Sequence, residues 1–241
     1  MEILIGILGF TTVCFLALSV YLFKQNTQAV EKAEKNIFEL FMAGAYANRL
    51  LWFETLNQRA LDDPVVFIGD SLIEEWPLQE LFTSAKYLNR GIGGDTTTNL
   101  LQRLDHTFAG LSPEKIVLLI GTNDLNEPET TTAMILENIT GIVAKLKTEF
   151  PAAQVHMLSL LPVGDKDDPG IDPTTVGARS NTRIRTINDK LETLDDVIYH
   201  DVHRLLVDQK GYLDPAFTRE GLHLSPRGYL VLSDHLKQAG L

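Results

Sequence analysis

The 241-residue chain is long enough to bury one substantial hydrophobic core, and its 44% hydrophobic and 22% charged residues exclude an intrinsically disordered protein. Its formal net charge of −11 argues against a nucleic-acid partner, because such proteins bind mostly by neutralising phosphates. The single cysteine, Cys14, excludes an internal disulfide framework and a zinc site built on cysteines.

The N-terminal stretch of residues 3–23, ILIGILGFTTVCFLALSVYLF, contains no charged residue. As a helix it would be roughly 30 Å long, which matches the hydrocarbon thickness of a bilayer. We therefore expect residues 1–24 to form a transmembrane anchor and the protein to be a single-pass membrane protein. A buried core helix is a less favoured interpretation.

A cleaved signal peptide is the main alternative for this stretch. No basic residue precedes it and its apolar run exceeds the usual ~7–15 residues, but the small residues in TQA at positions 27–29 would permit cleavage, and the protein would then be exported. The side of the membrane stays open, because the positive-inside rule rests here on Lys24, Lys32 and Lys35 alone.

Residues 25–60 are predicted to form a helical linker to the folded domain. Apolar residues recur at spacings of three and four between about residues 29 and 57, without a proline. Several of these apolar residues are bulky, so an amphipathic helix on a membrane surface is the alternative.

Residues 61–241 are predicted to form one α/β domain. Five short, continuous apolar runs alternate with longer segments of helical periodicity, which indicates strands buried on both faces. We therefore predict a three-layer α/β/α, doubly wound fold with a five-stranded parallel sheet. The predicted strands are residues 65–69, 86–91, 115–121, 154–162 and 197–202, and the predicted helices are residues 96–108, 129–150, 179–194 and one that begins at Pro226 with Ser225 as its N-cap.

Polar motifs follow directly after the predicted strands. Ligands bind at the carboxyl ends of the strands in an open parallel sheet, so these motifs are expected to meet at one edge. Taken singly, each has a structural interpretation: Ser71 as a helix N-cap, Asn123 as a turn residue and His223 as a packing histidine. The motifs are GDS (69–71), GIGGDTT (91–97), GTND (121–124), LLPVG (160–164) and, before the last helix, REGLHLSP (219–226).

In these motifs the chain resembles the SGNH, or GDSL-type, hydrolase family, a group of esterases and lipases on a flavodoxin-like α/β/α fold. GDSL at residues 69–72, GIGGDTT, GTND and GLHLSP occur in the order of the family, over roughly residues 64–236. The resemblance implies a serine esterase that works through an acyl-enzyme intermediate. The glycine and histidine motifs are most similar to the platelet-activating-factor acetylhydrolase-like branch, which implies a short acyl group such as acetyl.

The resemblance also implies roles for individual residues. Ser71 is expected to be the nucleophile, and His223 the base that takes its proton. The oxyanion of the tetrahedral intermediate would be bound by the backbone N–H groups of Ser71 and Gly94 and by the side-chain amide of Asn123. A glycine suits this role because it has no Cβ to obstruct the substrate.

Glu220 stands where the family usually has an aspartate, three residues before the histidine. A glutamate can orient an imidazole in the same way, so Glu220 is the expected third member of the triad. Because its side chain is one methylene longer, a Ser–His dyad with Glu220 turned outward is the alternative. Asp201 and Asp214 are more distant substitutes.

The expected partner is a small acyl ester of a lipid or carbohydrate. A weakly active or non-catalytic binding module is one alternative, and an acyltransferase that uses the same site is another. The mechanism implies no cofactor and no metal, and the oligomeric state is not predicted. Residues 164–177 are expected to form a solvated loop near the site, and Asp70, Asp95 and Asp124 to hold their loops through local hydrogen bonds.

Overall fold

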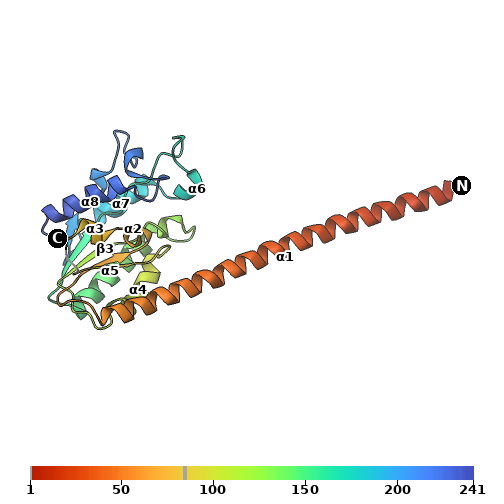
Figure 1. Cartoon of the computed structure of the whole chain (residues 1–241). Helices are drawn as coiled ribbons and strands as arrows, with labels where there is room; N and C mark the ends of the chain where they lie inside the picture. Colours follow the sequence, from red (N-terminus) through yellow and green to blue (C-terminus); the bar gives the residue numbers. More distant parts are fainter. Residues whose placement is uncertain (1, 84–85) are drawn as a thin grey trace. The chain divides into compact units, whose positions relative to one another are not determined.

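The computed structural model describes residues 2–83 and 86–241; the side chains of residues 2–18, Cys14 among them, and of residues 38, 39 and 42 lie outside the description. The chain divides into two compact units, Met1–Arg49 and Leu50–Leu241 (Figure 1). The described residues of the first unit are all helical, and the second unit holds the sheet.

The first element, α1 (Glu2–Asn57), is one helix of 56 residues. Within the described part of the chain, no helix combines the length and the apolar character that a bilayer crossing needs. The predicted transmembrane anchor, and with it the single-pass membrane localisation and the membrane partner, is therefore wrong. Among the described side chains of α1, the apolar residues 20–23 give way at once to Lys24, and α1 continues through Glu31 and Lys32.

The last two turns of α1 are part of the second unit, whereas we expected the folded domain from residue 61. Phe53 is buried in this unit, and the guanidinium of Arg90 lies 5.1 Å from the centre of its ring. The Asn57 amide donates to the carbonyl of Thr107 at 3.0 Å and accepts from Arg90 at 2.8 Å. Residues 50–57 are thus anchored by both apolar and polar contacts.

All five strands are parallel, in the order β2-β1-β3-β4-β5. This is the flavodoxin-like order of a doubly wound sheet, so the predicted three-layer α/β/α fold with five parallel strands is confirmed. The strands are β1 (Val65–Gly69), β2 (Tyr87–Gly91), β3 (Lys115–Leu119), β4 (Gln154–Leu158) and β5 (Ile198–His200).

Helices form the two outer layers. In one layer α4 (Thr97–Phe108) contacts α5 (Thr132–Glu149), which contacts α7 (Asn181–Leu191). The other layer contains α8 (Pro226–Gln238), whose Ser233 accepts a hydrogen bond from Trp76. Ser225 caps α8, as predicted. The short helices are α2 (Ser71–Glu74), α3 (Leu78–Leu81) and α6 (Pro173–Val176), with 3-10 turns η1 (Asp124–Asn126), η2 (His203–Leu205) and η3 (Pro215–Phe217).

The central strands are buried on both faces because their residues are apolar without interruption. Val66, Phe67 and Ile68 of β1 are inaccessible to solvent, and so are the middle residues of β3. Such strands cannot alternate between a wet and a dry face, so helices must cover both sides of the sheet. The carboxyl ends of β1, β2 and β3 then open together onto the motif-bearing loops.

Two buried histidines lie on the neighbouring strands β4 and β5. His156 Nδ1 lies 2.9 Å from His200 Nε2, and the two rings stack with 5.2 Å between their centres. Burial, with the nearby His200 and Lys115, lowers the pKa of His156 to about 4. Burial also lowers the pKa of His200, whose ring faces His235 of α8. Both histidines therefore pack in the neutral form.

We expect the free energy of unfolding to depend less on pH in His156→Leu than in the unaltered protein. In the unfolded chain His156 binds a proton below about pH 6.5, whereas in the folded chain it binds one only below about pH 4. The free energy of unfolding therefore decreases as the pH falls from about 6.5 to about 4. Between pH 8 and pH 5 this amounts to about 2 kcal/mol. Urea unfolding at the two pH values measures it. Replacement of the exposed His106 by Gln is the control, and an unchanged pH dependence in His156→Leu would contradict the assignment.

Candidate active site

Ser71 is the first residue of α2 and follows β1 after a tight turn. A Cβ at Gly69 would lie 2.0 Å from the carbonyl oxygen of Leu119 on β3. Only glycine can therefore occupy this position while β1 and β3 stay so close. Asp70 caps α2 by accepting from the Leu72 N–H at 2.9 Å. The cap is thus Asp70, which leaves the Ser71 hydroxyl free of that structural role.

The Asp70 carboxyl is fully buried beneath this turn. Burial raises its pKa to about 7, and the nearby Asp95 also raises it, while the bond from Leu72 and the charge of Arg179 lower it. Asp70 therefore changes its charge near neutral pH directly beside Ser71. The expectation of a local hydrogen bond is met at this residue.

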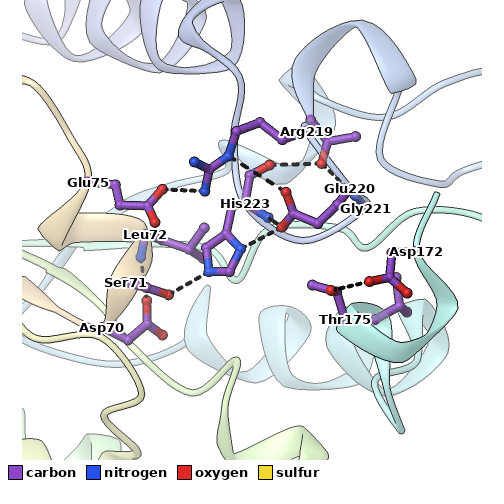
Figure 2. A network of polar contacts seen from close by, with 12 residues as sticks. Asp70, Ser71, Leu72, Glu75, Asp172, Thr175, Arg219, Glu220, Gly221 and His223 are labelled. Carbon is purple, nitrogen blue, oxygen red and sulfur yellow. Dashed lines mark hydrogen bonds and ion pairs between the residues drawn. The ribbon is translucent and has the colours of Figure 1, made fainter. Parts of the chain in front are cut away.

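Ser71, His223 and Glu220 lie in one line of polar contacts (Figure 2). Ser71 Oγ lies 3.0 Å from His223 Nε2, and His223 Nδ1 lies 2.5 Å from Glu220 Oε1. The side chains of His223 and Glu220 are each 23% exposed, so substrate and water can reach them. When Nδ1 carries the proton that faces the carboxylate, Nε2 is left as the acceptor for the serine hydroxyl.

The segment that carries His223 is held by its own backbone. The carboxylate of Glu220 also accepts from the backbone N–H of His223 at 2.9 Å, and Thr218 Oγ1 donates to the carbonyl of His223 at 2.8 Å. Gly221 adopts a φ of 102°, where a side chain would be strained. The longer side chain of Glu220 is accommodated because its carboxylate folds back over this turn, where Oε1 bonds both the ring and the backbone N–H of His223. Asp201 and Asp214 instead bind the backbone N–H groups of Arg204 and Ala216.

Arg219 joins this segment to the serine helix, a connection that the motifs did not reveal (Figure 2). Its guanidinium donates to Glu75 Oε2 at 2.6 Å and lies 3.6 Å from Glu220 Oε2. Glu75 is one turn beyond Ser71. The ion pair therefore ties the histidine segment to the serine across 144 residues of chain.

Gly94 lies on the loop after β2, with a φ of 82° and open space where a side chain would stand. The preceding residue, Gly93, donates its N–H to Glu74 Oε2 on the serine helix at 2.7 Å. The following residue, Asp95, forms a buried ion pair with Arg103 at 2.6 Å. These contacts on either side fix the backbone at Gly94, and the residue itself is exposed.

Asn123 follows β3 and is bonded through both ends of its amide. Its Nδ2 donates to the carbonyl of Asp95 at 3.0 Å, and its Oδ1 accepts from Arg179 at 2.8 Å. The neighbouring Asp124 accepts from the N–H of Thr97 at 2.9 Å and from its hydroxyl. The loops after β2 and β3 are thus fastened together. Asp95 and Asp124 hold this arrangement through bonds across the fold, not through the local bonds that we expected.

Residues 164–177 are partly folded, whereas we expected a solvated loop. They contain α6, whose cap Asp172 accepts from the Thr174 N–H at 2.9 Å. The buried side chains of Ile171 and Val176 crowd Gly221: a Cβ there would lie 2.6 and 2.9 Å from them. The segment thus supports the turn that carries Glu220.

Comparisons with known proteins show the family to which the chain belongs. The profile of the GDSL-like lipase/acylhydrolase family matches residues 67–231. Platelet-activating factor acetylhydrolase IB subunit alpha2 of Rattus norvegicus is 32% identical over 199 residues, which cover 78% of this chain and 82% of that protein. A solved structure from Streptococcus pneumoniae, provisionally described as a platelet activating factor, has 34% identity and a TM-score of 0.77, and covers 85% of this chain and 96% of its own.

A third similarity concerns the fold alone. The crystal structure of a GDSL-like lipase from Bacteroides thetaiotaomicron has a TM-score of 0.68 at 24% identity, and covers 79% of this chain and 96% of its own. Taken together, the comparisons define a hydrolase that acts on ester bonds. The chain belongs to the GDSL-like lipase/acylhydrolase family, so the resemblance stated from its motifs is confirmed.

Proposed function

We propose that this hydrolase is a serine esterase with Ser71 as nucleophile, His223 as general base and Glu220 as the orienting carboxylate. The observation that supports it most is the 3.0 Å contact between Ser71 Oγ and His223 Nε2, with Glu220 on the opposite ring nitrogen. A serine hydroxyl is a poor nucleophile until a base removes its proton, and this contact supplies that base.

In the proposed reaction His223 takes the proton of Ser71 as its oxygen attacks the ester carbonyl. The negative oxygen of the tetrahedral intermediate is bound by the N–H groups of Ser71 and Gly94 and by the amide of Asn123. When the intermediate collapses, His223 gives the proton to the departing alcohol. Water, activated by the same imidazole, then releases the acid from Ser71.

We propose a short acyl group, such as acetyl, on a lipid or carbohydrate alcohol. The similarity to an acetylhydrolase supports the acyl group. An apolar pocket of about 530 Å³ beside the histidine segment favours an alcohol with an apolar part, since the alcohol departs on the side of His223. The pocket is lined by Glu75, Pro77, Arg219, Leu224, Pro226 and Tyr229.

The test is a series of 4-nitrophenyl esters from acetate to laurate with the full-length protein. We expect kcat/KM to be highest for acetate and at least tenfold lower for octanoate, because a one-methylene misfit in a pocket already costs about 1–3 kcal/mol. Rapid quenching should recover an acyl group on the peptide that contains Ser71. Equal rates across the series would contradict the short-chain preference, and an acylated alcohol formed from an added acceptor would assign an acyltransferase.

A further inference from the structure

The two ends of the Asn123 amide meet groups that can bond in only one way. The Arg179 guanidinium can only donate, so the amide atom 2.8 Å from it must be oxygen. The carbonyl of Asp95 can only accept, so the atom 3.0 Å from it must be nitrogen. The amide therefore has one possible orientation, with one N–H used by Asp95. Its second N–H has no acceptor among the described residues.

Arg179 is held as firmly as the amide that it contacts. It lies just before α7 and is 8% exposed. Its Nε donates to the carbonyl of Thr122 at 2.8 Å, and one terminal nitrogen donates to the carbonyl of Thr175 at 3.0 Å. A guanidinium bound on three sides cannot rotate, so the position of the Asn123 oxygen is set by the fold around it.

The chain before Arg179 is fixed to the same turn. The N–H of Ala178 donates to Asn126 Oδ1 at 2.8 Å. Gly177 has a φ of 60°, and a Cβ there would lie 2.2 Å from the same Asn126 oxygen. The segment before α7 therefore braces the turn that carries Asn123 from both sides.

The guanidinium also supplies charge. Burial disfavours its charged form and lowers its pKa, but an arginine keeps its proton in proteins. A cation that bonds the amide oxygen draws electrons toward it, and the free N–H becomes a stronger donor. This N–H is the group that would bind the oxyanion, and such donors are effective when they are oriented before the reaction.

We propose that Arg179 is a positioning residue of the oxyanion hole: it orients and polarises the Asn123 amide without touching the substrate. This inference rests on the proposed function, because it assumes that Asn123 binds the oxyanion. It assigns a role to a residue that lies 56 positions from Asn123 in the chain and outside every motif.

A double-mutant cycle tests the proposal with 4-nitrophenyl acetate. We expect Asn123→Ala to lower kcat about 10²–10³-fold, and Arg179→Met to lower it about 10–100-fold, because the amide is then free to turn. KM should change less than about threefold, since the oxyanion forms only in the transition state. In the Asn123→Ala background, Arg179→Met should have almost no further effect on kcat.

Arg183→Gln is the matched control. Arg183 lies on α7, is partly buried and binds the carbonyl of Thr130 in the neighbouring loop, and its hydrogen bonds to described residues do not include one to Asn123. Its replacement should leave kcat within about threefold of the starting protein and should not interact with Asn123→Ala. Thermal unfolding of each variant shows how much stability has been lost.

Arg179 also attracts the buried carboxylate of Asp70, so Arg179→Met could affect Ser71 through its neighbour Asp70 as well as through Asn123. The same cycle with Asp70→Asn separates the routes: the loss from Arg179→Met should persist there and vanish only with Asn123→Ala. Arg179→Lys offers a milder variant if methionine prevents folding, because a single ammonium group keeps the charge but cannot reproduce the planar fork with which the guanidinium holds Thr122, Thr175 and Asn123 from separate nitrogens. It should give an intermediate kcat with the same dependence on Asn123.

The outcomes separate this inference from the proposed function. Full activity in Asn123→Ala would remove the oxyanion role, and the proposed mechanism would fail with it. A large effect of Asn123→Ala together with an equal loss from Arg179→Met in both backgrounds would overturn the positioning role alone. An effect of Arg179→Met on KM without kcat would overturn it as well.

Discussion

Ser71→Ala is expected to lower kcat for 4-nitrophenyl acetate by about 10⁴–10⁶-fold, the size of loss that follows removal of the nucleophile from other serine hydrolases. The reason is chemical: without the hydroxyl no acyl-enzyme can form, and His223 has no proton to take. KM should change little, because the alanine leaves the oxyanion donors and the backbone of α2 in place. Steady-state kinetics of the purified full-length protein measures the effect.

Ser225→Ala is the control for this loss. Ser225 caps α8 two residues after His223, so its removal should cost about 1 kcal/mol of stability but leave kcat nearly unchanged. A fluorophosphonate probe should label the unaltered protein and Ser225→Ala, but not Ser71→Ala. A loss of less than tenfold in Ser71→Ala would remove Ser71 from the role of nucleophile.

The sequence predicted the sheet well because its signal is local. The uninterrupted apolar run of β1 marked its position to the residue. The third run extended to residue 121, yet β3 ends at Leu119, because Gly121 turns the chain with a φ of 123°. The N-terminal prediction rested on the length and the apolar composition of one segment, and it failed because no helix in the described part of the chain is long and apolar enough to cross a bilayer.

The predicted site residues lie at the turns that their motifs form, because each motif contains the residues that its own turn needs. Ser71, His223 and Glu220 are in contact, and the loops of Gly94 and Asn123 are joined. Their catalytic roles remain predictions. Arg179 and Arg219 hold these residues through contacts that gave no local signal, although Arg219 itself stands in the REGLHLSP motif. Their side chains act across 56 and 144 residues of chain, where no spacing rule applies.

Glu220→Gln should lower kcat by about 10⁴-fold, as the equivalent amide does in a serine protease. If the amide oxygen keeps the bonds to His223, the NH₂ group faces Arg219 at the position now 3.6 Å from the guanidinium, where two donors meet. If the amide turns over, NH₂ faces Nδ1 and the proton moves to Nε2. The imidazole then presents the wrong tautomer to Ser71 and cannot act as a base.

Glu220→Asp and Glu75→Gln show whether the loss is specific. The shorter carboxylate of Glu220→Asp withdraws from both the ring and the backbone N–H of His223, so we expect kcat to fall about 10–100-fold. Glu75→Gln weakens the ion pair with Arg219 but leaves Glu220 on His223, and because exposed ion pairs contribute little, kcat should fall far less than in Glu220→Gln. The kinetics of all three variants with 4-nitrophenyl acetate provide the comparison. A kcat for Glu220→Gln within tenfold of the unaltered protein would assign a Ser–His dyad, and a gain in Glu220→Asp would mean that the longer side chain holds the imidazole poorly.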